Sequence, residues 1–474
     1  MTAYETVIGL EVHTELDTET KLFCGCRNAF GDEPNTNICP TCLGLPGSLP
    51  VVNQQAVEFA LRLGVALQCE VRRGIFARKN YFYPDMPKDY QISQYDLPTN
   101  VDGSLDLADG TRVGIERAHI EEDTGKSTHV GGGGRIHEAG YSLVDYNRAG
   151  VPLMEIVSRP DLRSAEDARA YVQELRGILL ATGVSDARME EGSLRVDANV
   201  SVRPEGTDVL GTRCEVKNLN SLRSLGRAID YEVQRQIELI EAGDAVVQET
   251  RHWDEDDGRT HTLRTKEEAT DYRYFPEPDL VPLEPDPAWV DDVRAALPTL
   301  PAQRRADLLE LSAGAGGPEA VSLVVLRGRD ELAASAIGEG GPPEIVLKHI
   351  EHNLPAEGPI DLDPGHLARL AQMEAAGDLT ATQAKQVLAE VVATGTDPDA
   401  VAADKGFEAL AEDELGSVID GLIQANPDEW ARFVEGDDQV RGKLTGFFVG
   451  RVMKATQGKA DGKAVTAQLR SRAG

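Results

Sequence analysis

Carboxylates and one imidazole in separate segments form the first group of residues that could do chemistry. Glu11 and His13 are two residues apart in an alternating segment, so in a strand they project from the same side, about 6–7 Å apart. A second acidic cluster runs from His119 to Asp123, and Glu155 lies between apolar residues. Oxygen ligands with one imidazole favour Mg²⁺ or Mn²⁺ over zinc, because hard cations prefer carboxylates. Taken singly, each acid is also explained as the solvent side of a half-exposed strand.

Four of the six cysteines occur in two close pairs. Cys24 and Cys26 form C-x-C, and Cys39 and Cys42 form C-x2-C. In a cytosolic protein two such pairs indicate a tetrahedral zinc site, since each short turn directs two thiolates at one ion. Four thiolates leave no vacant coordination position, so this zinc is expected to be structural. A redox pair and four unligated buried thiols are the alternatives.

Two segments combine cations with groups that suit a nucleotide. Residues 78–85 place two cations beside three aromatic side chains, which can neutralise phosphates and stack on bases. Ordinary core aromatics with a lysine are the alternative. Lys217 and Asn218 precede a predicted helix, whose N-terminus exposes amide N–H groups to an anion. Simple capping by Asn220 or Ser221 explains the same residues.

A hydrolytic nucleophile is not evident. Residues 123–128 suggest a phosphate-binding loop, but the motif G-x4-G-K-[ST] needs glycine where Ile120 stands. The run Gly131–Gly134 opens no predicted helix and fits a hairpin tip. The sequence has no G-x-S-x-G and no recognisable Ser/Lys amidase signature.

The charge of the chain is strongly uneven. The 474 residues include 48 Lys+Arg and 80 Asp+Glu, a net charge of −32, which disfavours nucleic acid as a partner unless a local basic patch exists. Such a patch follows residue 440, where Asp461 is the one acid. A solvated tail that balances an acidic body is the alternative. The basic residues there are Arg441, Lys443, Arg451, Lys454, Lys459, Lys463, Arg470 and Arg472.

No segment suggests a membrane or an export route. The longest apolar stretches fall far short of the roughly 20 residues that span a bilayer, and the first residues lack a basic and an apolar region. We therefore expect a cytoplasmic protein without a membrane partner.

The elements that must position these residues follow from periodicity. Residues 4–16 alternate, with Leu10 and Val12 opposite Glu11 and His13, which predicts a strand. Apolar residues at helical spacing, with capping residues and terminal glycines, predict helices at 53–68, 164–182 and 221–242. Further strands are predicted at about 111–122, 141–157, 194–202 and 212–217.

Proline clusters and glycine breaks divide the chain. Prolines gather between residues 276 and 301, and a second break covers 394–399. We predict an α+β protein with a large mixed-sheet domain at 1–292, which includes the cysteine loop 24–42. A helical domain at 293–400 and a small helical tail domain at 401–474 follow.

Together, several long motifs resemble the B-subunit family of the aspartyl/glutamyl-tRNA(Asn/Gln) amidotransferases, from residue 4 to the end. The four-cysteine loop resembles the zinc-bearing branch of that family, while Thr124 and a longer 131–140 hairpin are small departures. The matching motifs are residues 7–13, 78–85, 90–94, 121–129, 142–148, 189–195, 217–221 and 271–279.

The resemblance implies an architecture and a reaction. It implies a cradle-shaped catalytic domain, a helical domain and a tail domain similar to the YqeY family. The partners would be an amidase (glutaminase), which is the A subunit of the complex, and a small belt-like C subunit. The reaction would convert mischarged Glu-tRNA(Gln) or Asp-tRNA(Asn) to its amide with ATP and glutamine. Because a carboxylate is a poor electrophile, it must first become an acyl phosphate, a step of positioning and charge neutralisation.

The resemblance also assigns roles to residues. It implies that Mg²⁺ is held by Glu11, His13, Glu121 and Glu155, and zinc by Cys24, Cys26, Cys39 and Cys42. Glu122 would be the gate where ammonia arrives, and Lys79 would line that passage or the phosphate site. From the residue chemistry above, ATP contacts are expected at Lys79, Tyr81, Lys217 and Asn218, and tRNA contacts at Arg441, Lys443, Arg451, Lys454 and Lys459.

Three alternatives remain at this point. A non-catalytic tRNA-binding scaffold of the same complex would leave phosphorylation to another protein of that complex. The archaeal homologue that pairs with an asparaginase-like partner carries an inserted domain for which this chain has no room. A free zinc-ribbon RNA-binding protein would function without partners. The sequence also leaves open which mischarged tRNA is used and whether Glu121 or Glu122 lies nearer the metal, because a one-residue slip swaps strand faces.

Overall fold

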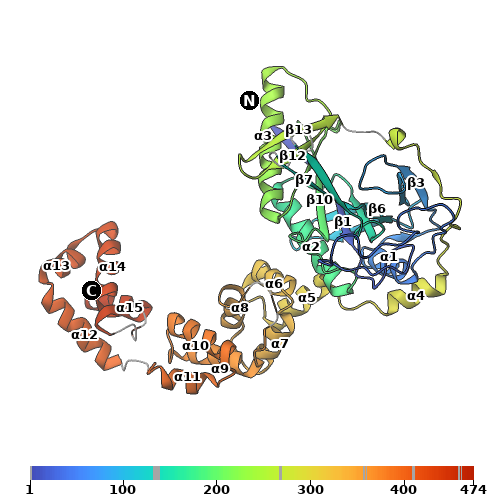
Figure 1. The fold of residues 1–474 in the computed structure, drawn as a ribbon. Coiled ribbons are helices and arrows are strands. Elements are labelled where there is room, and N and C mark those ends of the chain that lie inside the picture. Colours follow the sequence, from blue (N-terminus) through green and yellow to red (C-terminus); the bar gives the residue numbers. More distant parts are fainter. Residues whose placement is uncertain are drawn as a thin grey trace. The chain divides into compact units, whose positions relative to one another are not determined.

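The computed structural model describes residues 3–131, 139–265, 269–355, 358, 360–407, 412–456, 460 and 462–473. The chain forms two compact units, Met1–Gln303 and Arg304–Gly474. Strands and helices make up the first unit, and the described elements of the second unit are helices (Figure 1). The predicted α+β class is therefore confirmed.

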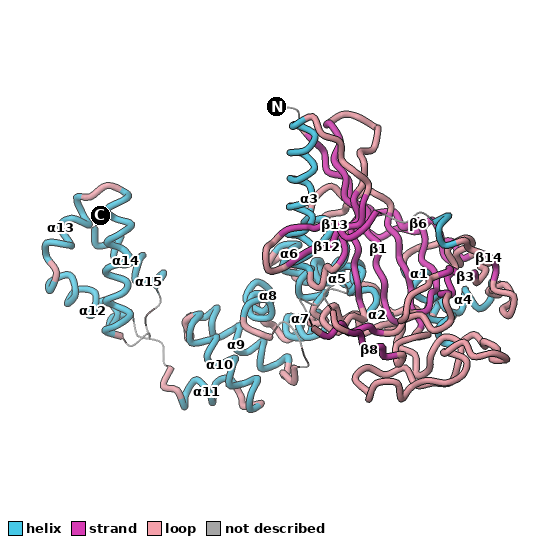
Figure 2. The backbone as a smooth tube through the Cα atoms, turned by 45° about the horizontal axis from the view of Figure 1, so that its top comes forward, coloured by secondary structure: helices cyan, strands magenta, loops and turns pink. Residues whose placement is uncertain are grey.

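A mixed sheet forms the centre of the first unit (Figure 2) and has twelve strands among the described residues. Its order is β13-β12-β11-β10-β1-β9-β6-β4-β3-β14, and β5, which lies off this path, pairs with β2 and with β6. The pair β11–β12 is parallel and the other pairs are antiparallel. The strands are β1 (Tyr4–Glu15), β2 (Glu70–Val71), β3 (Ala77–Asn80), β4 (Tyr90–Ser93), β5 (Asn100–Asp106), β6 (Arg112–Glu122), β9 (Pro152–Ser158), β10 (Leu194–Pro204), β11 (Cys214–Lys217), β12 (Glu249–Asp254), β13 (Arg259–Thr265) and β14 (Phe275–Pro276).

Strand β1 lies in the middle of this sheet, between β10 and β9. Its predicted alternation is confirmed, since Leu10 and Val12 are fully buried in the core. Glu11 and His13 therefore lie on the opposite face. In the register of the sheet, His13 is opposite Glu155 of β9, and Glu11 is opposite Asp197 of β10.

Three helices cover the apolar face of the sheet, and all three were predicted. Asn53 caps α1 (Gln54–Ala66), Ser164 caps α2 (Ala165–Thr182) and Ser221 caps α3 (Leu222–Ala242), each through its side-chain oxygen. Helices α2 and α3 end at glycines with positive φ, Gly183 and Gly243, a conformation that side chains with a Cβ disfavour. The shared core of helices and strands includes Leu10, Ile156, Leu63, Leu175 and Leu225.

The predicted strand at 141–157 is wrong, because a turn divides it. β8 (Tyr141–Asp145) pairs with β7 (Lys126–Val130) in a separate two-stranded sheet, whereas β9 joins the main sheet. In the turn, the N–H of Ala149 donates to the carbonyl of Tyr146, and Gly150 has φ 86°. A glycine in that conformation ends an extended segment that apolar residues alone would continue. At the predicted hairpin tip, residues 132–134 lie outside the described residues.

Helices follow the sheet along the chain. Among the described helices, none is both long and apolar enough to cross a membrane. The helices that follow the sheet are α4 (Pro287–Ala295), α5 (Pro301–Leu311), α6 (Gly317–Leu326), α7 (Asp330–Gly338), α8 (Pro343–His352), α9 (Pro364–Ala376), α10 (Ala381–Thr394), α11 (Pro398–Asp404), α12 (Glu412–Ala425), α13 (Pro427–Glu435), α14 (Asp438–Ala455) and α15 (Gly462–Ala473). A 3₁₀ helix at Ala269–Tyr272 precedes β14.

The described residues of the second unit form two hydrophobic cores. One includes Leu308 and Val401, and the other includes Leu415 and Leu469. The boundaries expected at residues 292 and 400 fall inside α4 and α11, where Val293 packs in the core of the first unit. These two boundaries stay predictions.

Candidate active site

Three of the four predicted magnesium ligands meet on the sheet face opposite the helices. The Nε2 atom of His13 lies 3.8 Å from Oε2 of Glu155, and ligand atoms of His13, Glu121 and Glu155 all lie within 4.8 Å of one another. They come from β1, β6 and β9, which are neighbours in the sheet. Two carboxylates and one imidazole at this spacing suit Mg²⁺ or Mn²⁺. This group is called the His13 cluster below.

Glu11 lies beside the His13 cluster in a second acidic group. The ligand atoms of Glu11, Asp197 and Glu215 lie within 4.8 Å of one another. This grouping arises because β10 pairs with β1 and places Asp197 opposite Glu11. Asn199 donates to Oε1 of Glu11 at 2.9 Å, and Nζ of Lys217 lies 2.5 Å from Oδ2 of Asp197. Among the described residues, Glu11 therefore groups with Asp197 and Glu215 rather than with the other three predicted ligands, although it lies on the same face of the sheet.

A lysine lies close to the carboxylates of the His13 cluster. Burial opposes the charged form of Lys79, but Glu121, Tyr274 and Glu155 outweigh it and raise the pKa of Lys79 above its usual range. Burial also opposes ionisation of Glu121, yet Lys79 is the main charge that holds the pKa of Glu121 below its usual range. The ammonium group lies 5.0 Å from the ring centroid of Tyr272. The site therefore holds a cation, Lys79, beside the ionised carboxylate of Glu121.

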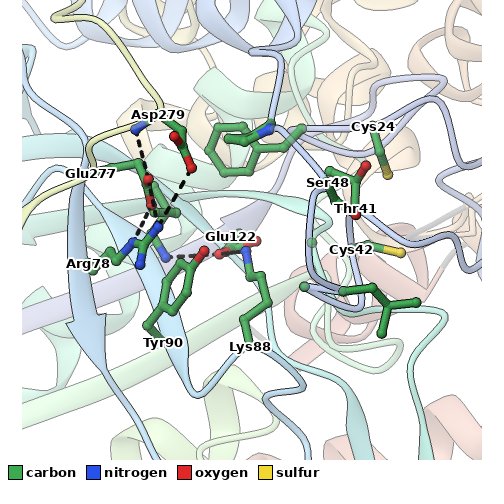
Figure 3. A pocket seen from close by; sticks show the side chains of 16 residues that line it. Cys24, Thr41, Cys42, Ser48, Arg78, Lys88, Tyr90, Glu122, Glu277 and Asp279 are labelled. Carbon is green, nitrogen blue, oxygen red and sulfur yellow. Dashed lines mark hydrogen bonds and ion pairs between the residues drawn. The ribbon is translucent and has the colours of Figure 1, made fainter.

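Glu122 faces away from this cluster and into a cavity of about 250 Å³. Its carboxylate forms an ion pair with Lys88 and accepts a hydrogen bond of 2.9 Å from the N–H of Ile92. Arg78 forms a second, bidentate ion pair in the same cavity, at 2.6 and 2.9 Å from the carboxylate of Glu277 (Figure 3). Of the two adjacent glutamates, Glu121 therefore belongs to the His13 cluster and Glu122 to this cavity. Other lining residues are Cys24, Thr41, Cys42, Ser48, Tyr90 and Asp279.

The cysteine loop borders the same cavity. The Sγ atoms of Cys24, Cys26, Cys39 and Cys42 lie within 4.8 Å of one another, which fits a four-thiolate zinc site. The N–H of Cys39 donates to Sγ of Cys42 at 3.1 Å. A hydrogen bond from Cys24 is the main cause that lowers the pKa of Cys42 to about 5. At least one thiolate is therefore present at neutral pH.

The predicted nucleotide contacts have different surroundings. Lys217 ends β11, and its pKa lies above the usual range because Asp197 and Glu215 outweigh burial. Asn218 follows with φ 67° and donates from Nδ2 to the carbonyl of Trp253 at 2.9 Å, so it shapes a turn. Tyr81 stacks on another ring, that of Tyr83, at a centroid distance of 4.4 Å.

Two residues of the site were missed by sequence reasoning. His119 is fully buried, and its Nε2 lies 3.4 Å from Glu121 and 3.5 Å from Glu155. Its position two residues before Glu121 was a usable signal, because both must share a strand face. Lys88 had no such signal, since its pairing with Glu122 brings the turn before β4 to β6, 34 residues further along the chain.

The predicted tRNA contacts gather on α14. Arg441, Lys443, Arg451 and Lys454 are exposed there, while Lys459 lies outside the described residues. Lys443 and Lys454 are about three helical turns apart and so lie on one side of the helix. The guanidinium of Arg451 is 4.4 Å from the ring centroid of Phe447.

Comparisons with known proteins give a consistent result. A family model described as the GatB/GatE catalytic domain matches residues 6–291, and one described as the GatB domain matches residues 345–472. The chain is similar to proteins named as the B subunit of aspartyl/glutamyl-tRNA(Asn/Gln) amidotransferase. One from Frankia casuarinae is 51% identical over 99% of this chain and 96% of its own length. Another, from Moorella thermoacetica, is 48% identical over 99% of both chains. A third, from Thermobifida fusca, is 48% identical over 97% and 92%.

Proposed function

The chain belongs to the family of aspartyl/glutamyl-tRNA(Asn/Gln) amidotransferase B subunits, and from this membership we propose that it binds a mischarged tRNA and activates its aminoacyl carboxylate with ATP. The family resemblance predicted from the motifs is thereby confirmed. The overall reaction is that of a ligase, which turns Glu-tRNA(Gln), Asp-tRNA(Asn) or both into Gln-tRNA(Gln) or Asn-tRNA(Asn) with glutamine as the amide donor. The single observation that supports a catalytic role is the His13 cluster with Lys79 beside it.

The chemistry proceeds in two displacements. A carboxylate oxygen of the aminoacyl group attacks the γ-phosphorus of ATP, ADP leaves, and an acyl phosphate forms. Ammonia then attacks the acyl carbon, inorganic phosphate leaves, and the amide remains after loss of a proton. Lys79 contributes positive charge where the phosphoryl group is transferred, which is the main requirement of such a step.

The His13 cluster supplies the ligands for Mg²⁺. His13, Glu121 and Glu155 would hold the ion, which would supply neutralisation of charge on phosphate oxygens. Glu11 remains a proposed fourth ligand, supported by its position two residues from His13 on the same strand face. Lys217 lies close to the acidic group of Glu11, which supports a contact with ATP on that side. Asn218 and Tyr81 remain proposed ATP contacts, although the side-chain amide of Asn218 is bonded to a carbonyl.

Ammonia is proposed to come from a glutaminase partner, the A subunit, in a heterotrimer that also contains a small C subunit. The cavity that contains Glu122 and Lys88 supports an entry point for ammonia, because Glu122 is adjacent to Glu121 in β6. The cysteine loop, with structural Zn²⁺ bound, would form one wall of this cavity. The exposed cations of α14 support a contact with the tRNA backbone, and a cytoplasmic location follows from the substrate.

A non-catalytic scaffold role in the same complex is the alternative, and one experiment separates the two. The chain is reconstituted with its glutaminase partner and its small partner, and ATP hydrolysis that depends on mischarged tRNA is measured. We expect Glu155→Gln, still folded and able to bind tRNA, to lower this rate about 100-fold or more. The matched control is Glu70→Gln, which alters an exposed carboxylate of β2. A Glu155→Gln rate equal to wild type would establish the scaffold instead.

A further inference from the structure

Glu155 lies between two histidines on neighbouring strands. In the register of the sheet it is opposite His13 of β1 on one side and opposite His119 of β6 on the other. The side chain of His13 is 21% exposed, whereas that of His119 is fully buried. The two imidazoles therefore have different access to a cation that enters the cluster.

The surroundings of His119 indicate which ring nitrogen carries the proton. Its Nε2 lies 3.4 Å from Oε1 of Glu121, 3.5 Å from Oε2 of Glu155 and 3.4 Å from Oγ of Ser93. Its Nδ1 is buried and has no hydrogen-bond partner among the described residues. In a neutral imidazole one ring nitrogen carries the proton and the other a lone pair, and the proton is best placed on the nitrogen that has oxygen acceptors around it, since a buried N–H without a partner is unfavourable. The proton therefore belongs on Nε2, which faces oxygen acceptors.

We propose that His119 is a positioning residue, whose Nε2–H bonds to the carboxylates of Glu121 and Glu155 and holds them in place for a divalent cation. The inference rests on the proposed function of the His13 cluster. Because Nε2 carries a proton, His119 is not itself a ligand. His13 then supplies the single imidazole of the site.

The other neighbours of the two carboxylates fit this division. Gln91 donates from Nε2 to Oε2 of Glu121 at 3.2 Å, and Nη2 of Arg117 lies 3.9 Å from Oε1 of Glu155. Lys79 acts on both carboxylates, Gln91 contacts only Glu121 and Arg117 only Glu155 among these neighbours, and His119 lies between the two carboxylates. Donors of this kind fix ligand orientation, and their loss typically weakens metal binding about 10–100-fold.

The test is a direct titration of the full chain, with its zinc site loaded, by Mn²⁺, read as the signal of free Mn²⁺ in electron paramagnetic resonance. We expect His119→Phe to weaken Mn²⁺ binding about 10–100-fold. His119→Gln keeps an N–H near the position of Nε2 and should bind Mn²⁺ close to wild type. The matched control is His349→Phe, which removes another buried histidine that is bonded to a glutamate, in α8. This control should not change Mn²⁺ binding.

The nitrogen coupling of bound Mn²⁺ adds a readout that a structural role would not change. At saturating Mn²⁺, the coupling should persist in His119→Gln and disappear in His13→Ala. Wild-type affinity in a folded His119→Phe, or a coupling that survives His13→Ala and is lost in His119→Gln, would overturn the inference while the cation site stands. Wild-type protein that binds no Mn²⁺ would overturn the cation site itself. If His119→Phe does not fold, His119→Gln and the nitrogen coupling still test the proposal. Weak Mn²⁺ binding by His119→Gln would contradict it.

Discussion

Glu121 and Glu122 are adjacent in β6, yet their carboxylates enter two different sites. Glu121 joins the His13 cluster, and Glu122 pairs with Lys88 in the cavity beside the cysteine loop. One side chain anchors both residues, since Nε2 of Gln91 donates to Oε2 of Glu121 and to the carbonyl of Glu122 at 2.7 Å. A single strand thus connects the proposed phosphoryl-transfer site with the proposed ammonia entry.

This arrangement predicts that substitutions of these two neighbouring residues affect different steps of the reaction. Glu121→Gln should lower tRNA-dependent ATP hydrolysis about 100-fold or more, because it removes charge from the metal site. Glu122→Gln should keep ATP hydrolysis and lose amide formation from glutamine. Both reactions are measured in the reconstituted complex. Equal loss of ATP hydrolysis in the two variants would contradict the separation of the sites.

The ion pair of Lys88 with Glu122 should also matter for stability. The side chains are only 10% and 2% exposed, so Lys88→Met leaves a buried carboxylate without its cation. We expect the free energy of unfolding of the first unit to fall by about 3–5 kcal/mol. Urea unfolding followed by circular dichroism measures the change. The double variant Lys88→Met/Glu122→Gln should recover much of the loss, and a double variant as unstable as the single one would argue against a charge effect.

The four cysteines predict one zinc equivalent per chain. Cys42→Ser should lose this zinc, measured by elemental analysis of purified protein, because a structural zinc site needs all four thiolates. A strong chelator should likewise lower the melting temperature of wild type, since zinc binding contributes directly to folding. Cys69→Ser alters a buried cysteine outside the loop and should keep the metal. Full zinc content in Cys42→Ser would exclude this set of ligands.

The cations of α14 predict a salt-dependent contact with tRNA. Lys443→Gln combined with Lys454→Gln should weaken tRNA binding and reduce the slope of log affinity against log salt by about 0.7–0.9 for each lost phosphate contact. Filter binding at several salt concentrations measures the slope. The control is Lys385→Gln, an exposed lysine of α10. An unchanged slope in the double variant would place the tRNA contact elsewhere.

A buried histidine predicts acid sensitivity of the second unit. His349 of α8 is fully buried, and burial lowers its pKa below the usual value even though Glu374 of α9 favours the charged form. Two other groups lie near His349. Lys348 forms an ion pair with Glu374, and the side-chain amide nitrogen of Asn353 lies 2.9 Å from Nδ1 of His349. The unfolded chain therefore binds a proton that the folded chain does not. Stability should fall as the pH drops below about 6.5, by up to about 1.4 kcal/mol per pH unit, until the folded pKa is reached.

Thermal unfolding of the chain between pH 7 and pH 5 tests this slope. His349→Gln cannot titrate and should show a flatter pH dependence over that range. His352→Gln, which alters an exposed histidine of the same helix, should keep the slope of wild type. A slope that survives His349→Gln would assign the acid sensitivity to another group.

Local patterns in the sequence determined several parts of this protein. The helices α1, α2 and α3 follow from apolar spacing together with the caps Asn53, Ser164 and Ser221. Each of these signals acts within one or two helical turns, so neighbouring residues suffice to define it. The alternation of β1 and the two cysteine pairs are local in the same way. The family motifs could also be identified from the sequence alone.

The tertiary structure decided which of these local elements meet. The order β10-β1-β9-β6 places His13 opposite Glu155 and Glu11 opposite Asp197. Glu11 and Glu155, which the sequence had placed in one set of ligands, therefore fall in two different groups. The pairing of Lys88 with Glu122 and the burial of His119 between two carboxylates are likewise long-range results. Strand order and register depend on how the whole sheet packs against its helices, and no segment of the sequence carries that information alone.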